Sequence, residues 1–190
     1  MNYLLLIKHS LPEIVPTIPT NQWKLSEAGQ LRCKTLVKKI EPYFPNVVIS
    51  SVEPKAVETA QFIAQEINTS FDTFEGLHEH DRTGVEFLSK EQFEANIHDF
   101  FKHPDQFVMR RETANQARQR FCNALTSILK KYPNKNIAVV SHGTVITLFV
   151  EKMTAREPFS FWKRLDLPSF VVFSLPQLKL ITTVEHVDEQ

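Results

Sequence analysis

The chain has 190 residues, a length that fits one domain with a sizeable core and leaves little room for two. Lysine plus arginine and aspartate plus glutamate both total 22, so the balanced charge gives no support for a nucleic-acid partner or an anionic membrane surface. The first residues lack the pattern of a secretory leader, and no apolar run approaches the ~20 residues that span a membrane. We therefore expect a soluble cytoplasmic protein, with Cys33 and Cys122 as reduced core thiols.

Strand-like and helix-like segments alternate along the chain, which predicts an α/β structure with a largely parallel sheet. The expected strands are residues 4–8, 47–49, 71–77 and 137–141, followed by a hairpin of edge strands at 170–174 and 178–184. The expected helices are one capped by Ser26, one beginning at Ser51 or Glu53, one over residues 117–128 and one opened by His142-Gly143. A Pro-rich loop, residues 11–20, is expected to run over the surface near the tip of the first strand.

The alternation breaks between residues 79 and 113, which are charged and aromatic. We interpret this segment as a lid inserted into a single domain that spans residues 1–190. Phe93, Ile97, Phe100 and Phe101 recur at helical spacing and predict a helix within the lid. Their aromatic stripe is typical of packing, but the same pattern fits the mouth of a site for apolar phosphate esters, and the sequence favours neither interpretation strongly.

Two histidines stand at the ends of apolar runs, His9 after the first strand and His142 after residues 137–141. Parallel strands of one sheet end at a common edge, so we expect both imidazoles to meet in one crevice. The helix after Ser50-Ser51 is expected to present free backbone N–H groups there, and Lys8 and Lys55 would add positive charge. Such a crevice favours an anion such as phosphate.

A neutral imidazole in this crevice can attack phosphorus and form a phosphohistidine, which water then cleaves. We expect His9 to be this nucleophile and His142 to bind the transferring group. The leaving oxygen needs a proton, and Glu79 is placed to supply it and then to activate water, with Glu75 and Asp81 as nearby alternatives. A neutral His9 and a protonated Glu79 together favour a mildly acidic to neutral pH window.

These segments resemble the histidine phosphatase superfamily, which includes the phosphoglycerate mutases. The similarity covers most of the chain and rests on four stretches in the family's order, which are residues 6–10, 50–60, 77–79 and 140–146. Glu112-Thr113 is similar to a further pair that precedes a long helix in many members. The resemblance implies a three-layer α/β/α sandwich of phosphoglycerate mutase-like fold, with His9 phosphorylated, Glu79 as proton donor and His142 as the second histidine.

The chain departs from the family pattern at the expected phosphate pocket. Two family arginines are replaced by Lys8 and Lys55, and the glycine after the nucleophile is Ser10. Lysine keeps the charge but loses the planar fork that binds two phosphate oxygens at once. Arg82 or Arg156 could return a guanidinium to the pocket. The expected substrate-binding residues are therefore Lys8, Ser10, Lys55, Arg82 and Gly143.

The sequence thus predicts a metal-independent phosphatase that hydrolyses small phosphate monoesters through His9 without a cofactor. Two alternatives stay open: a weak or inactive homologue that binds a phosphorylated ligand or protein partner, and a phosphoglycerate mutase-type phosphotransferase. His78 and His80 form a His-x-His pair, but no further ligands at suitable spacing accompany it, so we expect no metal site. The sequence does not predict the oligomeric state or the physiological substrate.

Overall fold

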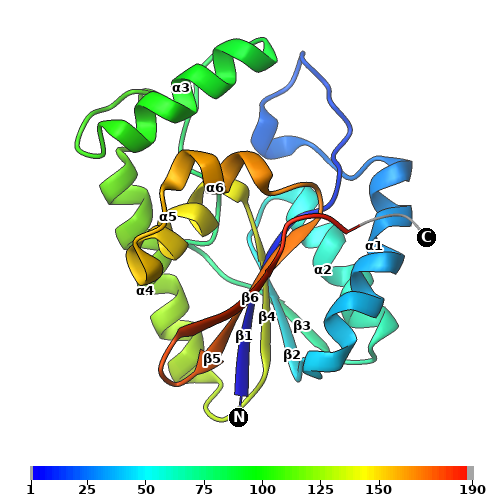
Figure 1. The fold of residues 1–190 in the computed structure, drawn as a ribbon. Helices are drawn as coiled ribbons and strands as arrows, with labels where there is room; N and C mark the ends of the chain where they lie inside the picture. Colours follow the sequence, from blue (N-terminus) through cyan, green and yellow to red (C-terminus); the bar gives the residue numbers. More distant parts are fainter. Residues whose placement is uncertain (1, 188–190) are drawn as a thin grey trace.

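A computed structural model describes residues 2–187. These residues form one six-stranded sheet with the order β3-β2-β4-β1-β5-β6 (Figure 1). The strands are β1 (Asn2–Lys8), β2 (Val47–Ser50), β3 (Ser70–Thr73), β4 (Ile137–Ser141), β5 (Ser169–Leu175) and β6 (Lys179–Val184). β3, β2, β4 and β1 run parallel, whereas β5 is antiparallel to both β1 and β6. The prediction of a mostly parallel sheet is confirmed.

Within residues 2–187, six α-helices pack against this sheet. Figure 1 shows them on both of its faces. They are α1 (Glu27–Ile40), α2 (Pro54–Glu66), α3 (Lys90–Lys102), α4 (Ala114–Lys131), α5 (Gly143–Thr154) and α6 (Pro158–Arg164), with short 3-10 turns η1 (Thr20–Gln22) and η2 (Glu41–Tyr43). Alternate residues of the buried strands point to opposite faces, so each face has its own core. On one face Leu5 and Ile7 pack with α1 and α2, and on the other Leu4 and Leu6 pack with the remaining helices. The expected three layers are confirmed.

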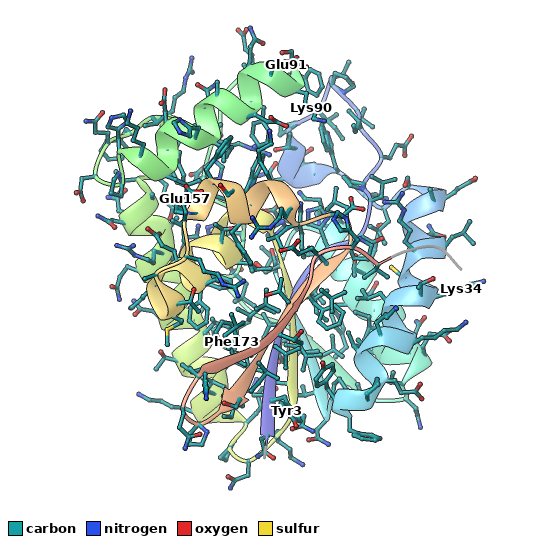
Figure 2. The ribbon with its side chains drawn as sticks, in the orientation of Figure 1. Tyr3, Lys34, Lys90, Glu91, Glu157 and Phe173 are labelled. Atoms are coloured by element: carbon teal, nitrogen blue, oxygen red, sulfur yellow. The ribbon has the colours of Figure 1, made fainter. Side chains whose placement is uncertain are left out.

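Local sequence signals explain where several helices begin. Ser26 caps α1 by accepting a hydrogen bond from the Gly29 N–H, and Glu53 precedes α2 with Pro54 in its first turn. A Cβ atom at Gly29 would lie 2.1 Å from the Leu11 carbonyl oxygen, so only glycine lets the 11–20 loop pack this closely against α1. Lys34 points away from the sheet on the exposed face of α1 (Figure 2). The Ser26 cap and the start of α2 match the sequence pattern, whereas the close approach at Gly29 was not anticipated.

Three local expectations were wrong. The third strand ends at Thr73 rather than residue 77, because the chain turns at Gly76, whose φ of +86° suits glycine. β5 lies inside the sheet, with Phe173 near its middle (Figure 2), so only β6 of the C-terminal hairpin is an edge strand. Cys33 is a buried free thiol, but free Cys122 is only half-buried and is not a core residue. α6, which follows the Glu157-Pro158 start signal, was not anticipated.

The carboxyl ends of β1, β2 and β4 meet at one edge of the sheet. Above this edge lie α3, α6 and the loop that leads into α1 (Figure 1). Each of the three strands is followed there by a polar segment, which includes His9 after β1, Ser51 after β2 and His142 after β4. This edge is the part of the molecule where the expected chemistry gathers.

Candidate active site

His9 and His142 lie next to each other at this edge. Their ring centroids are 5.1 Å apart, and both side chains are almost fully buried. His9 Nδ1 lies 2.8 Å from the Ser10 carbonyl oxygen, an acceptor that fixes the proton on Nδ1 and leaves Nε2 with a free lone pair. Burial, the neighbouring His142 and the positive charge of Lys55 hold the His9 pKa well below its usual range. His9 is therefore neutral and has one nitrogen free to act as a nucleophile.

His142 precedes α5 and is held by the β2 tip. Its Nε2 lies 2.8 Å from Ser51 Oγ and 3.4 Å from Glu53 Oε1. Its Nδ1 is buried and has no hydrogen-bond partner among the described residues. Donation from the Ser51 hydroxyl to Nε2 would put the proton of neutral His142 on Nδ1. That N–H is then available to a ligand oxygen, which matches the expected role of His142.

Glu79 lies at the N-terminus of α5, where its Oε2 accepts a hydrogen bond from the Thr144 N–H at 3.2 Å. Its Oε1 accepts from the His80 N–H at 3.0 Å and lies 3.5 Å from His80 Nδ1. Burial raises the pKa of this carboxyl, but the hydrogen bond from His80 and the positive charge of Arg82 outweigh it and hold the pKa well below its usual range. Glu79 is thus ionised in the ligand-free site and must gain a proton before it can act as an acid.

Lys8 lies beside the first turn of α5. Its Nζ donates a hydrogen bond to the Leu165 carbonyl at 2.6 Å. A Cβ atom on Gly143 would lie 3.1 Å from Lys8 Cε, so the glycine leaves room for the lysine side chain. Burial lowers the pKa of Lys8 to about 8, although Glu79 and Asp166 oppose the shift. The Gly143 N–H opens α5, where the partial positive charge of a helix favours an anion.

Lys55 is in the pocket but is already paired. Its Nζ lies 2.5 Å from Glu53 Oε2 and donates to the Thr20 carbonyl at 2.7 Å. The N-terminus of α2 does not present the free N–H groups that the sequence predicted, because the Lys55 N–H donates to the Trp23 carbonyl and the Ala56 N–H donates to the Glu53 carbonyl. The helix terminus that faces the site is that of α5, so this expectation was wrong about which helix contributes.

Arg82 is the guanidinium that the structure brings to the site. Its Nη2 donates to Thr20 Oγ1 at 3.2 Å, and its Cζ lies 4.6 Å from the centre of the Phe93 ring. Burial lowers the pKa of Arg82, and the negative charges of Glu79 and Glu53 oppose this shift. Arg156, the alternative, is exposed and follows the C-terminal end of α5, about 18 Å along that helix from the site. The alternative is therefore wrong.

Ser10 is fully buried, and its side chain has a local partner. Its hydroxyl donates to the Gly29 carbonyl at 2.7 Å, and its N–H donates to Thr59 Oγ1 at 3.1 Å. The expected hydroxyl contact with substrate is therefore not prepared in this structure. Ser10 instead joins the tip of β1 to α1 and α2, and its carbonyl orients His9.

Arg120 fixes the segment that carries Glu79. Its guanidinium makes two hydrogen bonds to the Glu112 carboxylate, at 2.8 and 2.7 Å. It also donates to the carbonyl oxygens of Gly76, His78 and Glu79, at 2.8 to 3.2 Å. All five N–H groups of the side chain are thus engaged, which holds the backbone before Glu79 in one conformation.

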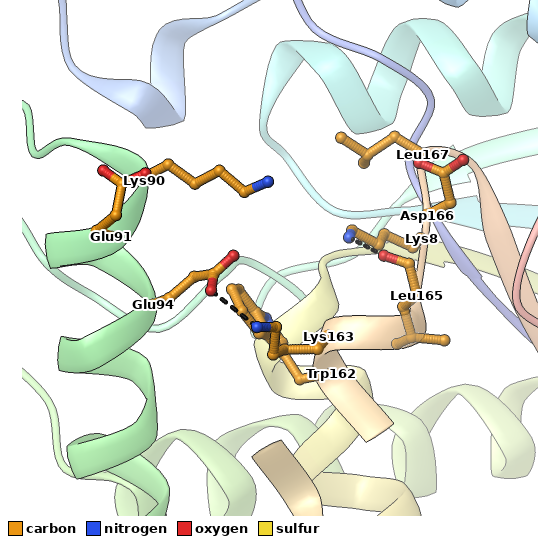
Figure 3. Close-up of a pocket in the computed structure, with 9 residues that line it drawn as sticks. All are labelled: Lys8, Lys90, Glu91, Glu94, Trp162, Lys163, Leu165, Asp166 and Leu167. Atoms are coloured by element: carbon orange, nitrogen blue, oxygen red, sulfur yellow. Dashed lines mark hydrogen bonds and ion pairs between the residues drawn. The ribbon is translucent and has the colours of Figure 1, made fainter. Parts of the chain in front are cut away.

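An open cavity of about 610 Å³ adjoins the histidine site at Lys8 (Figure 3). Its other lining residues come from α3 and from the end of α6 with the loop after it, and they are Lys90, Glu91, Glu94, Trp162, Lys163, Leu165, Asp166 and Leu167. Lys163 Nζ pairs with Glu94 Oε2 at 3.0 Å, whereas the ammonium group of Lys90 extends into the open space (Figure 3). The cavity is polar and is bounded partly by the segment expected to form a lid.

Residues 18–177 match the family model of the histidine phosphatase superfamily (branch 1). The chain belongs to this superfamily. The resemblance to this superfamily is therefore confirmed, although the matched residues do not include the stretch 6–10, which carries Lys8 and His9.

Several proteins that this superfamily member resembles are named as phosphatases. The uncharacterized phosphatase PhoE of Bacillus subtilis (strain 168) is 19% identical over 134 residues, which cover 70% of this chain and 66% of that protein, just under two thirds of its length. A mutant phosphoserine phosphatase from Entamoeba histolytica in complex with phosphoserine is 21% identical, with 98% of each chain covered and a TM-score of 0.77. A mycobacterial glucosyl-3-phosphoglycerate phosphatase in complex with VO3 is 14% identical, with 97% of this chain and 99% of that chain covered and a TM-score of 0.79. At these identities the structural matches establish the fold.

Two site residues of this superfamily member escaped the sequence analysis, Glu53 and Arg120. Glu53 was considered only as a helix start, yet its carboxylate contacts Lys55, His142 and the Glu79 N–H. Its place at the tip of β2 was the signal that could have found it. Arg120 gave no signal, because its partners are mostly backbone carbonyls far away in sequence.

Within residues 2–187, no group of three or more His, Cys, Asp or Glu side chains could hold a metal ion, and no helix could span a membrane.

Replacing Arg120 with methionine is expected to lower the free energy of unfolding by about 2–3 kcal/mol, because Glu112 and three carbonyl groups lose their donor. Urea unfolding measures this change. Arg118→Met on the same helix is the control, since the Arg118 ion pair with Glu151 is partly exposed and should contribute less than about 1 kcal/mol. Equal losses of unfolding free energy in both variants would contradict this stabilising role of Arg120.

Anion binding is expected to weaken as the pH rises through about 8, where Lys8 loses its proton. Below this pH the lysine is charged, and above it the neutral amine no longer attracts the ligand. Calorimetric titration with sulfate measures this effect, because sulfate keeps a constant charge over the range. The Lys8→Met variant should bind sulfate more weakly, and its sulfate affinity should not fall as the pH rises through about 8. A decline of the same size in Lys8→Met would show that another group causes it.

Proposed function

We propose that this protein hydrolyses small phosphate monoesters through a phosphohistidine on His9. The observation that carries the proposal is the free Nε2 of a neutral His9 beside His142, with Lys8 and Arg82 at the same edge of the sheet. In this arrangement His9 could attack a phosphoryl group that the cationic groups hold.

In the first step, His9 Nε2 forms a bond to phosphorus as the bond from phosphorus to the ester oxygen breaks. Protonated Glu79 gives its proton to the leaving alcohol. In the second step, ionised Glu79 takes a proton from water, the water oxygen attacks phosphorus, and the bond to His9 breaks. The negative charge of the phosphoryl group raises the pKa of Glu79 and so favours the proton that the first step needs.

The two pKa shifts change the expected pH window. A His9 pKa well below its usual range keeps the nucleophile neutral in mildly acidic solution. Glu79 is ionised in the free site, so the first step, which needs protonated Glu79, is faster at lower pH. We infer that hydrolysis is favoured on the mildly acidic side of neutrality.

The cavity at Lys8 is proposed to receive the leaving group. Its mixed charges and its single tryptophan suit a small polar alcohol better than a large apolar one. Residues 79–113 act in this proposal as the lid, because Lys90, Glu91 and Glu94 of α3 line the cavity. The related phosphoserine phosphatase, which was solved with phosphoserine, agrees with a small polar ester.

The second candidate is a protein that binds phosphate groups without turnover, and the pairing of Lys55 with Glu53 favours it. One experiment separates the two. Purified protein is incubated with 4-nitrophenyl phosphate, with and without EDTA, and sulfate binding is measured in parallel. EDTA-resistant hydrolysis supports the phosphatase. Sulfate binding without hydrolysis supports the binding protein, and hydrolysis that EDTA abolishes and a metal ion restores contradicts the metal-independent mechanism.

A further inference from the structure

A buried carboxylate lies among the cations of the proposed phosphate pocket. The Glu53 side chain is 7% exposed, and it contacts the site with both of its oxygens. Oε2 lies 2.5 Å from Lys55 Nζ, and Oε1 accepts the Glu79 N–H at 2.9 Å and lies 3.4 Å from His142 Nε2. The mechanism proposed above does not use this group, although it contacts three of the residues concerned.

The contacts of Lys55 show how far this carboxylate restrains the lysine. An ammonium group has three N–H donors. One is engaged by Glu53 and a second by the Thr20 carbonyl, so a single donor is left for a phosphoryl oxygen. The charge of Lys55 is also largely offset by the carboxylate beside it. An arginine has five N–H donors, so it would keep more of them free after the same contacts than a lysine does.

Five charged side chains lie around the phosphate pocket. The cations are Lys8 on β1, Lys55 on α2 and Arg82 after β3, and the anions are Glu53 before α2 and Glu79 before α3. The two carboxylates offset much of the positive charge of the three cations. A second negative charge on a ligand therefore gains less here than it would without Glu53.

We propose that Glu53 is the residue that sets the charge preference of this site. By restraining Lys55 it weakens the binding of doubly charged tetrahedral anions and brings their affinity close to that of singly charged ones. The catalytic consequence rests on the proposed function: inorganic phosphate would leave the site readily after hydrolysis. The binding effect itself requires no turnover.

Tungstate and perrhenate test this proposal, because both are tetrahedral oxoanions of similar size and they carry two and one negative charges. Calorimetry of wild type and Glu53→Gln gives the affinity for each. Glutamine keeps an oxygen for the Glu79 N–H while removing the charge. We expect Glu53→Gln to bind tungstate about tenfold more tightly and perrhenate about threefold or less more tightly. Loss of a merely structural contact would not tighten binding.

Glu58→Gln is the matched control, since Glu58 is on α2, is half-buried and accepts a backbone N–H from Leu25. Its tungstate affinity should equal that of wild type. Unchanged or weaker tungstate binding in folded Glu53→Gln overturns the proposal even if the protein is an active phosphatase. Tightened binding without any hydrolysis supports it while the proposed function fails. If Glu53→Gln does not fold, wild type decides: a tungstate preference over perrhenate above about tenfold contradicts the proposal, and a smaller one supports it.

Discussion

His9→Gln is expected to lower kcat for 4-nitrophenyl phosphate at least about 10⁴-fold, because the variant has no nitrogen lone pair to attack phosphorus. The remaining site groups can still bind the ester, so KM should change far less than kcat. Steady-state kinetics with purified protein measure both values. Sulfate affinity within about threefold of wild type would show that the pocket is intact.

The control for this variant is His98→Gln. His98 lies on α3 with a side chain that is 50% exposed, so its loss should leave hydrolysis unchanged. Residual activity in His9→Gln above about one per cent of wild type would mean that water attacks phosphorus directly or that another group is the nucleophile.

Glu79→Gln is expected to lower kcat by about 10²–10⁴-fold, and the step that slows should depend on the leaving group. An alkyl phosphate has a poor leaving group and needs the acid, so bond cleavage to the alcohol becomes limiting. 4-Nitrophenolate leaves without a proton, so the first step survives while water activation fails. Stopped-flow absorbance should then show a burst of nitrophenolate followed by slow turnover.

Glu75→Gln and Asp81→Asn are the controls, because these neighbouring carboxylates were the sequence alternatives to Glu79. Glu75 is exposed, and Asp81 Oδ1 accepts a hydrogen bond from the Thr83 N–H rather than from a group of the histidine site. Neither change should produce a burst. Equal losses of alkyl and nitrophenyl hydrolysis without a burst in Glu79→Gln would contradict its role as proton donor.

The layers, the mostly parallel sheet and the meeting of His9 with His142 could be predicted, because they follow from apolar runs and the polar residues that end them. The strand boundary at Thr73 could not, because it depends on a turn at Gly76 that the preceding β-like residues conceal. The prediction of free N–H groups at α2 failed because the Trp23 carbonyl, more than thirty residues earlier, accepts one of them.

The charge balance of the site was harder to predict than its nucleophile. Lysine at position 55 suggested a pocket cation, and nothing in the local pattern showed that Glu53 would pair with it two residues earlier. Ser10 likewise lies at the expected place, but its hydroxyl is used by the Gly29 carbonyl of α1. Both outcomes depend on side-chain directions at a helix start and a strand tip, which spacing alone does not specify.

The phosphoryl group is expected to pass through His9, and trapping the phosphohistidine is the decisive experiment. Wild-type protein is mixed with substrate, quenched in alkali within one turnover, digested and analysed by mass spectrometry. We expect a phosphorylated peptide containing His9 that is stable in alkali, is lost in acid, forms as fast as turnover and is absent from His9→Gln. Turnover without this species, or an acid-stable phosphoryl group on Ser10, would contradict it.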